Sequence, residues 1–180
     1  ANSKFRRGTR KNTVIPVDMV DVPVGSVDSV SHPIRMKSQE KFRELMKCRR
    51  KKQLEDPHHP IYHFTSPENK LNDPNGLSFW KGYWHLFYQA YPPEDPRQHW
   101  GHAISKDLIH WEDLPIAIYP NPEYQVFSGS ALVEEDRVIA IYHGTRLGNM
   151  VATSNDPLLL NWEKVTDGAP IPIHKPQGDR

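Results

Sequence analysis

Cysteine is almost absent from this sequence, since Cys48 is the one thiol among 180 residues. A single cysteine excludes a disulfide within the chain and a zinc site built from cysteine pairs. No run of about 18 apolar residues is present either, which argues against a membrane-spanning helix. The chain begins at Ala1 without an initiator methionine or a signal-peptide pattern, so we expect a processed chain or a fragment.

Proline, in contrast, is abundant. Its 17 copies and a hydrophobic content of 37% indicate many short elements joined by turns, as in an all-β domain. Charge is uneven along the chain: residues 1–55 hold 14 Lys and Arg against 6 Asp and Glu, and residues 56–180 hold 9 against 16. The N-terminal part is therefore expected to differ in kind from the rest.

This N-terminal part divides into two segments. Residues 1–37 mix basic residues with Val, Pro and Gly without a sustained period, which predicts an extended or disordered basic arm. Residues 38–55 have the period of an amphipathic helix, with Ser38 as its N-cap and Phe42, Leu45 and Met46 on one face. That apolar stripe is typical of packing.

Two clusters suggest other partners, and neither is specific. The basic run 49–52 has the charge to bind nucleic acid, but it lacks interleaved aromatic residues and fits the solvated face of a helix. His58, His59 and His63 have no acidic or cysteine ligand at a characteristic spacing. We expect no metal, nucleotide or redox cofactor, and no nucleic-acid or membrane partner.

From Tyr62 onward the sequence repeats a four-strand plan. The expected strands of the first unit are 77–80, 83–89, 100–105 and a short one around 110–112, and those of the second are 130–133, 138–142, 150–154 and 161–163. The segment Ala103–Asp107 leads to Trp111, and Ala152–Asp156 leads in the same way to Trp162. Four-stranded units of about 50 residues are typical of β-propeller blades.

Two blades do not make a closed propeller, because a complete ring normally has at least about four. Two alone would leave long unpaired strand edges and half a core. We therefore expect the remaining blades to come from a longer parent chain or from a second polypeptide.

The string Asn72–Gly76 carries the candidate catalytic group, the carboxylate of Asp73. Asp-Pro-Asn-Gly also suits a type I turn, with Pro second and Gly fourth, so a purely structural role has to be weighed beside catalysis. The neighbouring motifs decide between the two.

These motifs resemble glycoside hydrolase family 32, the invertases, levanases and inulinases. The similarity spans about residues 56–165. The matching segments are 63–67, 72–76, 85–89, 100–103 with Ser105, Asp107-Leu108, His110-Trp111 and 127–131. Their order along the chain makes the resemblance specific, whereas any one of them alone would be weak.

The resemblance implies a five-bladed propeller with a funnel-shaped pocket for a terminal β-D-fructofuranosyl unit, usually followed by a β-sandwich domain. Residues 56–180 would supply about the first two blades. It also implies that Asp73 is the nucleophile. The residues that it places around the fructose are Asn72, Gln89, Trp100, Phe127 and Ser128.

The chemistry of these side chains agrees with that assignment. A retaining glycosidase uses one carboxylate to attack the anomeric carbon and a second carboxyl about 5 Å away to protonate the leaving oxygen. The amides of Asn72 and Gln89 can bind sugar hydroxyls, and Trp100 offers a flat apolar wall. Structural roles stay open for three of them: Gln89 satisfying backbone groups, Trp100 in the blade core and Ser128 capping a bulge.

Trp111 and Trp162, one per repeat, are expected to be structural.

Two positions depart from the family pattern. Lys70-Leu71 stands where Trp-Met or Trp-Leu is common, and Tyr91-Pro92 stands where Asn-Pro is common. Both positions are expected near the pocket rim, where they bear on the sugar beyond the cleaved bond. Sucrose, levan and inulin are therefore not ranked as substrates.

Two family motifs do not occur in the chain: Arg-Asp-Pro, whose Asp stabilises the transition state, and Glu-Cys, whose Glu is the acid/base. We expect the chain alone to be inactive, and the whole protein to be a retaining β-fructosidase acting on sucrose or fructans. The alternatives are a carbohydrate-binding or regulatory propeller without the acid, a fructosyltransferase, and a related hydrolase of arabinan or xylan.

Overall fold

The computed structural model describes residues 33–60, 62–67, 70–93, 95–165 and 171–172. Most of the predicted basic arm, residues 1–32, lies outside the described residues. Two antiparallel sheets and one helix make up the described part of the chain.

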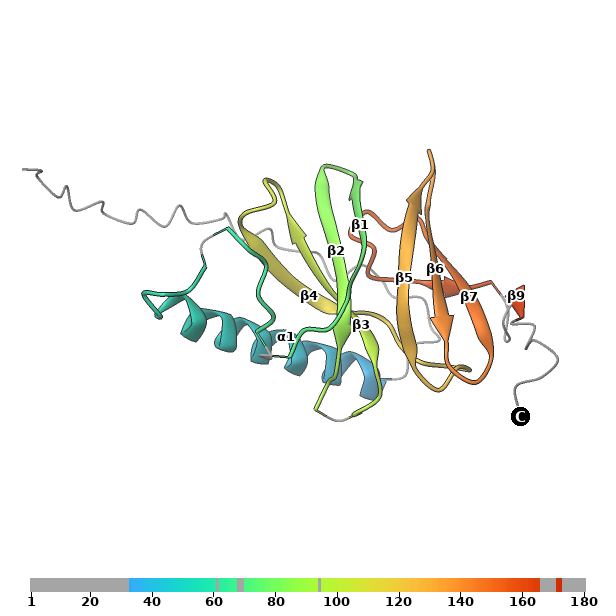
Figure 1. Cartoon of the computed structure of the whole chain (residues 1–180), viewed down its shortest axis with the longest axis horizontal. Helices are drawn as coiled ribbons and strands as arrows, with labels where there is room; N and C mark the ends of the chain where they lie inside the picture. The colour runs from blue at the N-terminus through green and yellow to red at the C-terminus, as the bar shows by residue number, and fades with distance from the viewer. Residues whose placement is uncertain (1–32, 61, 68–69, 94, 166–170, 173–180) are drawn as a thin grey trace, which may run out of the picture. The chain divides into compact units, whose positions relative to one another are not determined.

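The two sheets follow each other along the chain, as the sequence repeat predicts (Figure 1). The first has the order β1-β2-β3-β4, and the second has the order β5-β6-β7-β8, with β9 also paired to β7. Their bounds are β1 Pro74–Trp80, β2 Tyr83–Ala90, β3 His99–Ser105, β4 Trp111–Ile118, β5 Val126–Val133, β6 Val138–Gly144, β7 Gly148–Ser154, β8 Glu163–Lys164 and β9 Ile171–Pro172. The strand expected around 110–112 thus continues to Ile118, because Leu114 and 116–118 bury their apolar side chains.

The start of β1 differs from the type I turn that its sequence suits. Pro74 and Asn75 already pair with β2, and a register shift between Asn75 and Ser78 marks a β-bulge. Gly76 lies in this bulge with φ +51, and a Cβ there would lie 3.0 Å from the Cβ of Ala131 in β5. Glycine at this position, three residues after Asp73, therefore allows both the bulge and the close approach of β5.

The main core lies between the two sheets. Phe87, Trp100 and Ile118 of the first sheet are buried against Val126, Tyr142, Met150 and other residues of the second. β1 and β5 lie side by side at this junction (Figure 1). The ends of β1 and β5 are held together as a result, and these ends carry the candidate site.

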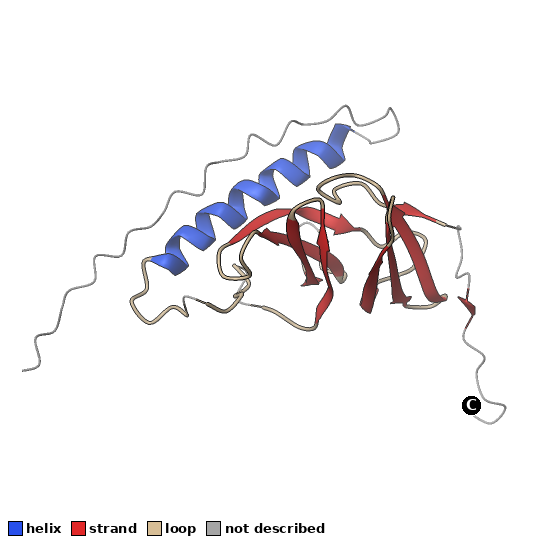
Figure 2. Ribbon diagram, turned by 90° about the horizontal axis from the view of Figure 1, so that it is seen from above, coloured by secondary structure: helices blue, strands red, loops and turns tan. Residues whose placement is uncertain are grey.

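The helix α1 spans Pro33–Leu54, so it begins before the predicted 38–55. Proline suits a first helical turn because its φ is already helical and its missing N–H is not needed there. Ser38 lies inside the helix, and its prediction as the N-cap was wrong. Phe42 and Met46 are buried against the first sheet, alongside which α1 lies in Figure 2. In the described part of the chain, no helix is long and apolar enough to cross a membrane.

Candidate active site

The Asp73 carboxylate lies just before β1, at the junction of the two sheets, and it is exposed. Its Oδ2 atom accepts a short hydrogen bond from the Ser128 hydroxyl and a second, of 3.3 Å, from Gln89 Nε2. The carbonyl of Asp73 accepts from the backbone N–H of Gln89 at 3.1 Å. Strands β2 and β5 thus fix a carboxylate that solvent reaches.

Gln89 and Ser128 also contact each other. Gln89 is buried at the end of β2, and its Nε2 donates to Ser128 Oγ at 2.8 Å. Because both donors act on Oδ2, the carboxylate is oriented with Oδ1 as the oxygen that can face a ligand. The structure therefore brings together three of the predicted site residues.

Asn75 is a further residue of this junction that the sequence did not single out. Its side chain is buried, its Nδ2 donates to the Asp73 carbonyl at 3.3 Å, and its Oδ1 accepts from the Gly129 N–H at 3.1 Å. It thereby ties β1 to β5 directly beneath Asp73. Its place in the 72–76 string was the available signal, and it was interpreted as a turn residue.

Asn72 makes a separate contact at the exposed edge of the site. Its Nδ2 donates to the Tyr91 hydroxyl at 2.7 Å, and that hydroxyl donates to Gln98 Oε1 at 3.1 Å. Burial is the main cause that raises the pKa of Tyr91, so its phenol keeps the proton that it donates to Gln98. The amide of Asn72 is thus linked to the β2–β3 loop and lies one residue from Asp73.

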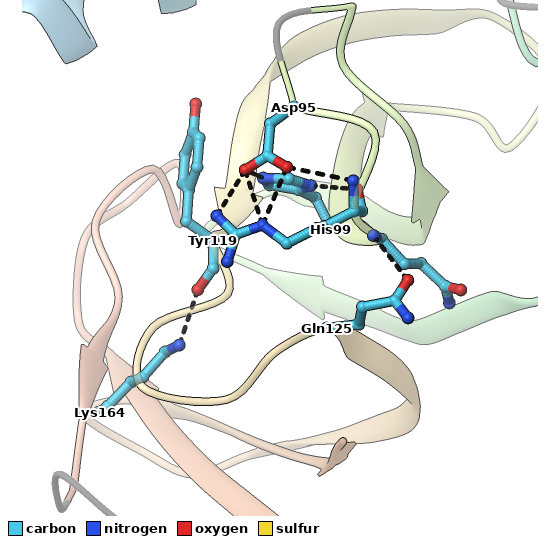
Figure 3. Close-up of polar contacts among 7 residues, drawn as sticks. Asp95, His99, Tyr119, Gln125 and Lys164 are labelled. Carbon is cyan, nitrogen blue, oxygen red and sulfur yellow. Dashed lines mark hydrogen bonds and ion pairs between the residues drawn. The ribbon is translucent and has the colours of Figure 1, made fainter. Parts of the chain in front are cut away.

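The β2–β3 loop is held in place by polar contacts at the C-terminal end of the loop (Figure 3). Asp95 accepts from Arg97 Nη2 at 2.6 Å, and the Arg97 carbonyl lies 2.7 Å from His99 Nδ1. Gln98 N–H donates to Gln125 Oε1 at 3.2 Å. The hydrogen bond from Arg97 is the main cause that lowers the pKa of Asp95, and burial lowers that of His99. At neutral pH the loop therefore holds an ionised carboxylate on Asp95, and the imidazole of His99, at the start of β3, is neutral.

Trp100 lies behind the site. Its side chain is fully buried between the sheets, near Phe87 and Tyr142, and its Nε1 donates to the Phe127 carbonyl at 2.9 Å. Its ring presents no face to a ligand in this structure. The burial of Trp100 therefore matches a role in the blade core and not that of a flat surface against a sugar ring. Phe127 is half-buried and precedes Ser128, so Trp100 reaches the site through the backbone of Phe127.

Trp111 and Trp162, which the sequence predicts to be structural, are partly buried and pack against other aromatic rings. Trp111 contacts Phe64 with ring centroids 5.7 Å apart, and Trp162 contacts Phe87 at 5.6 Å. Across the described ranges, no three His, Cys, Asp or Glu side chains gather as metal ligands would.

Comparison with known families places this site in context. Residues 63–180 match the model described as the glycosyl hydrolases family 32 N-terminal domain. The match contains every residue assigned above to the candidate site.

Two curated relatives are 40% identical to the chain. The levanase of Bacillus subtilis aligns with 66% of this chain and 20% of its own length. The fructan 6-exohydrolase of Beta vulgaris aligns with 62% of this chain and 21% of its own length. The chain therefore spans about a fifth of the length of these relatives.

Solved structures show the same similarity. The β-fructofuranosidase of Bombyx mori is 36% identical and superposes with a TM-score of 0.55 over 77% of this chain and 32% of its own. A variant of that enzyme in complex with sucrose superposes equally well, at 0.55 and 35% identity over 77% of this chain and 32% of its own. The sucrose-6-phosphate hydrolase of Lactobacillus gasseri has a TM-score of 0.58 and 27% identity over 78% of this chain and 29% of its own.

Proposed function

The chain belongs to glycoside hydrolase family 32, and we propose that it supplies the nucleophile and part of the fructose site of a retaining β-fructosidase. One observation carries this proposal: an exposed carboxylate, Asp73, is oriented by the Ser128 hydroxyl and the Gln89 amide where the two sheets meet. A surface turn would need no such support from two other strands. The arrangement fits a carboxylate that must be aimed at one atom of a ligand.

The chemistry begins with Asp73. Its carboxylate oxygen attacks C2 of the fructosyl unit while the glycosidic bond breaks, and a second carboxyl donates a proton to the leaving oxygen. The fructosyl-aspartyl ester that results is then hydrolysed by water, which the same second carboxyl deprotonates. Asn72 and Gln89 carry the amide groups that bind fructose hydroxyls, and Phe127 borders the pocket beside Ser128.

Trp100 acts in this proposal through Phe127. Its indole N–H fixes the carbonyl of Phe127, and the peptide that follows this carbonyl leads to Ser128. It is a positioning residue, which differs from the direct sugar contact that the family resemblance implies.

The second carboxyl, the carboxylate that stabilises the transition state and the remaining blades of a five-bladed ring belong to the longer protein in this proposal. The chain's coverage of a fifth of its curated relatives supports such a parent. Sucrose or a fructan is the proposed substrate, in line with relatives named levanase, fructan 6-exohydrolase and sucrose-6-phosphate hydrolase.

The test uses the longer protein and a slow fluorinated fructoside that accumulates the covalent ester. Mass mapping should find the label on Asp73, and Asp73→Asn should lose both the label and the release of fructose while it still binds fructose. Asp136→Asn, in the exposed β5–β6 turn, is the matched control and should behave as wild type. A label on another residue would remove Asp73 from the role of nucleophile. Fructosyl-sugar products in place of free fructose would favour transfer over hydrolysis.

A further inference from the structure

The two departures from the family pattern contact each other. Lys70 Nζ lies 3.8 Å from the centroid of the Tyr91 ring, and the Tyr91 hydroxyl binds Asn72. We infer that Tyr91, with Lys70 on its ring, is a positioning residue that orients the Asn72 amide for substrate. This inference rests on the proposed function, because it assigns a task to Asn72 in fructose binding.

Asn72 needs such a partner because it is exposed and lies before the first strand. An exposed amide can present either its donor or its acceptor side to a ligand. The Tyr91 hydroxyl donates to Gln98 Oε1, so it accepts from Asn72 Nδ2. The bond directs Nδ2 toward Tyr91 and leaves Oδ1 of Asn72 as the acceptor for a sugar hydroxyl.

The same bond links Asn72 to the strand that carries Ser128. Gln98 accepts from Tyr91 with its side chain, and its carbonyl accepts from the N–H of Val126, the first residue of β5, at 2.9 Å. Gln125, which binds the N–H of Gln98, directly precedes that strand. Asn72 is therefore linked through Tyr91 and Gln98 to β5, the strand that also positions Ser128.

Lys70, which is exposed, contacts the ring of Tyr91. Its ammonium group lies over the ring face, where the ring quadrupole attracts a cation. A ring held there has less freedom to turn its hydroxyl away from Asn72. Lys70 is close to Asn72 in sequence, so the contact also restrains the backbone segment that enters the site.

A double-mutant cycle in the longer protein tests this role, with Tyr91→Phe, Asn72→Ala and their combination assayed on sucrose. Tyr91→Phe keeps the ring and the Lys70 contact but removes the hydroxyl. We expect the KM for sucrose to rise about tenfold in each single variant with kcat changed less than about threefold. The double variant should have the same KM as Asn72→Ala alone, because both changes remove the same hydrogen bond between Asn72 and Tyr91.

Tyr83→Phe is the matched control, since Tyr83 begins β2, carries Lys106 Nζ at 5.5 Å from its ring and lies at the opposite end of the strand. It should leave both constants unchanged. If Tyr91→Phe fails to fold, Lys70→Met tests the same unit and should raise the KM, with Lys106→Met unchanged.

Three results would overturn the inference. Additive effects in the cycle would mean that Tyr91 acts apart from Asn72, and a Tyr91→Phe protein with wild-type KM would mean that the hydroxyl has no role. Both would leave the proposed function intact if wild type releases fructose and Asp73→Asn does not. A wild-type protein that releases no fructose from sucrose, inulin or levan would overturn the proposed function and this inference together.

Discussion

At the scale of single residues, the site depends on hydrogen bonds that converge on one oxygen. Asp73 Oδ2 receives both the Ser128 hydroxyl and the Gln89 amide, and Asn75 fixes the backbone below. Hydrogen bonds to a charged group are the stronger ones, because the full charge attracts the donor. Removal of one donor should therefore weaken catalysis without unfolding the sheets.

Ser128→Ala tests this expectation. Loss of a hydrogen bond to a charged group costs about 1.5–3 kcal/mol, so kcat/KM of the longer protein should fall roughly 10- to 100-fold. Ser130→Ala, two residues along β5 and also exposed, is the control and should stay near wild type. Equal activity of the two variants would show that the Ser128 contact does not matter in turnover.

Gly76 offers a second test at this scale, on stability. Its φ of +51 and the 3.0 Å between a Cβ and Ala131 combine backbone strain with crowding. Gly82 also has a positive φ, +91, but nothing lies within 4 Å of a Cβ there. Gly76→Ala should lower the free energy of unfolding by about 1–3 kcal/mol more than Gly82→Ala, because only the first must displace a neighbour. Equilibrium urea unfolding compares them, and equal losses would exclude crowding as a cause.

At the scale of elements, α1 is attached to the first sheet by a buried ion pair as well as by apolar contacts. Arg50 makes a short bond from Nε to Asp113 Oδ2, a second of 2.8 Å from Nη2 to Oδ1, and a third of 3.1 Å to the Thr65 carbonyl. Burial is the larger influence on the pKa of Asp113 and raises it, and Arg50 acts in the opposite direction. The carboxylate thus relies on Arg50 for compensation.

Arg50→Met should therefore destabilise the chain by about 3–5 kcal/mol, because it leaves a buried carboxylate without its cation. Thermal or urea unfolding measures the loss. Replacing both partners, with Arg50→Met and Asp113→Leu, should restore a large part of it. Lys51→Met, one residue along the helix and exposed, should have little effect. A small loss in the single Arg50 variant would show that the other contacts of α1, among them Phe42, Met46 and the ion pair of Arg43 with Glu112, are sufficient to hold it.

The first sheet also contains a histidine pair that should make it sensitive to acid. His85 Nδ1 lies 3.0 Å from His102 Nε2, and both side chains are buried. Burial lowers the pKa of His85 to about 4, with the Asp156 charge opposing it, and burial with the nearby His85 lowers that of His102. Both rings are neutral in the folded chain at neutral pH.

The direction of the pH effect follows from linkage. Between about pH 6.5 and 4 the unfolded chain binds a proton on His85 that the folded chain does not, so stability falls as the pH falls. The contribution of His85 is about 3 kcal/mol over this range. His85→Gln should flatten the fall in urea unfolding measured from pH 7 to 4.5, and the exposed His63→Gln should not. Identical slopes in wild type and His85→Gln would contradict the prediction.

At the scale of the whole molecule, the sequence predicted the two antiparallel sheets because each strand has local signals: turns at Lys81-Gly82 and at 134–137, and apolar residues between them. The repeat of Ala103–Asp107 at Ala152–Asp156 predicted two units with the same four-strand plan. The helix start was missed because Ser38 is a good cap in isolation, whereas Pro33 allows an earlier first turn.

The sequence named residues for the candidate site but did not specify the contacts among them. The structure brings Asp73, Gln89 and Ser128 within hydrogen-bond distance of one another, and their roles stay predictions. Trp100 could serve as sugar wall or core by its sequence alone, since a strand aromatic suits both, and only the packing of the second sheet places it inside. The contact of Tyr91 with Asn72 depends on the path of the β2–β3 loop, which no local pattern specifies.

The face of the second sheet that points away from the core carries exposed apolar side chains. Leu132 is 60% exposed and Ile141 is 41% exposed, whereas Ala131, on the opposite face of β5, contacts the core. A monomeric protein seldom leaves such strand faces open, and a following blade of the longer protein would bury them.

Thiol labelling can measure that burial when the labelled peptide that contains position 132 is quantified by mass mapping, with Cys48, the one cysteine of the 180 residues, replaced by serine. Leu132→Cys in this background should react with a maleimide rapidly in the 180-residue chain and far more slowly in the longer protein. Glu135→Cys, in the exposed turn after β5, should react rapidly in both. Equal rates at position 132 in the two proteins would mean that no blade packs on this sheet, because a covered thiol reacts only when the cover opens.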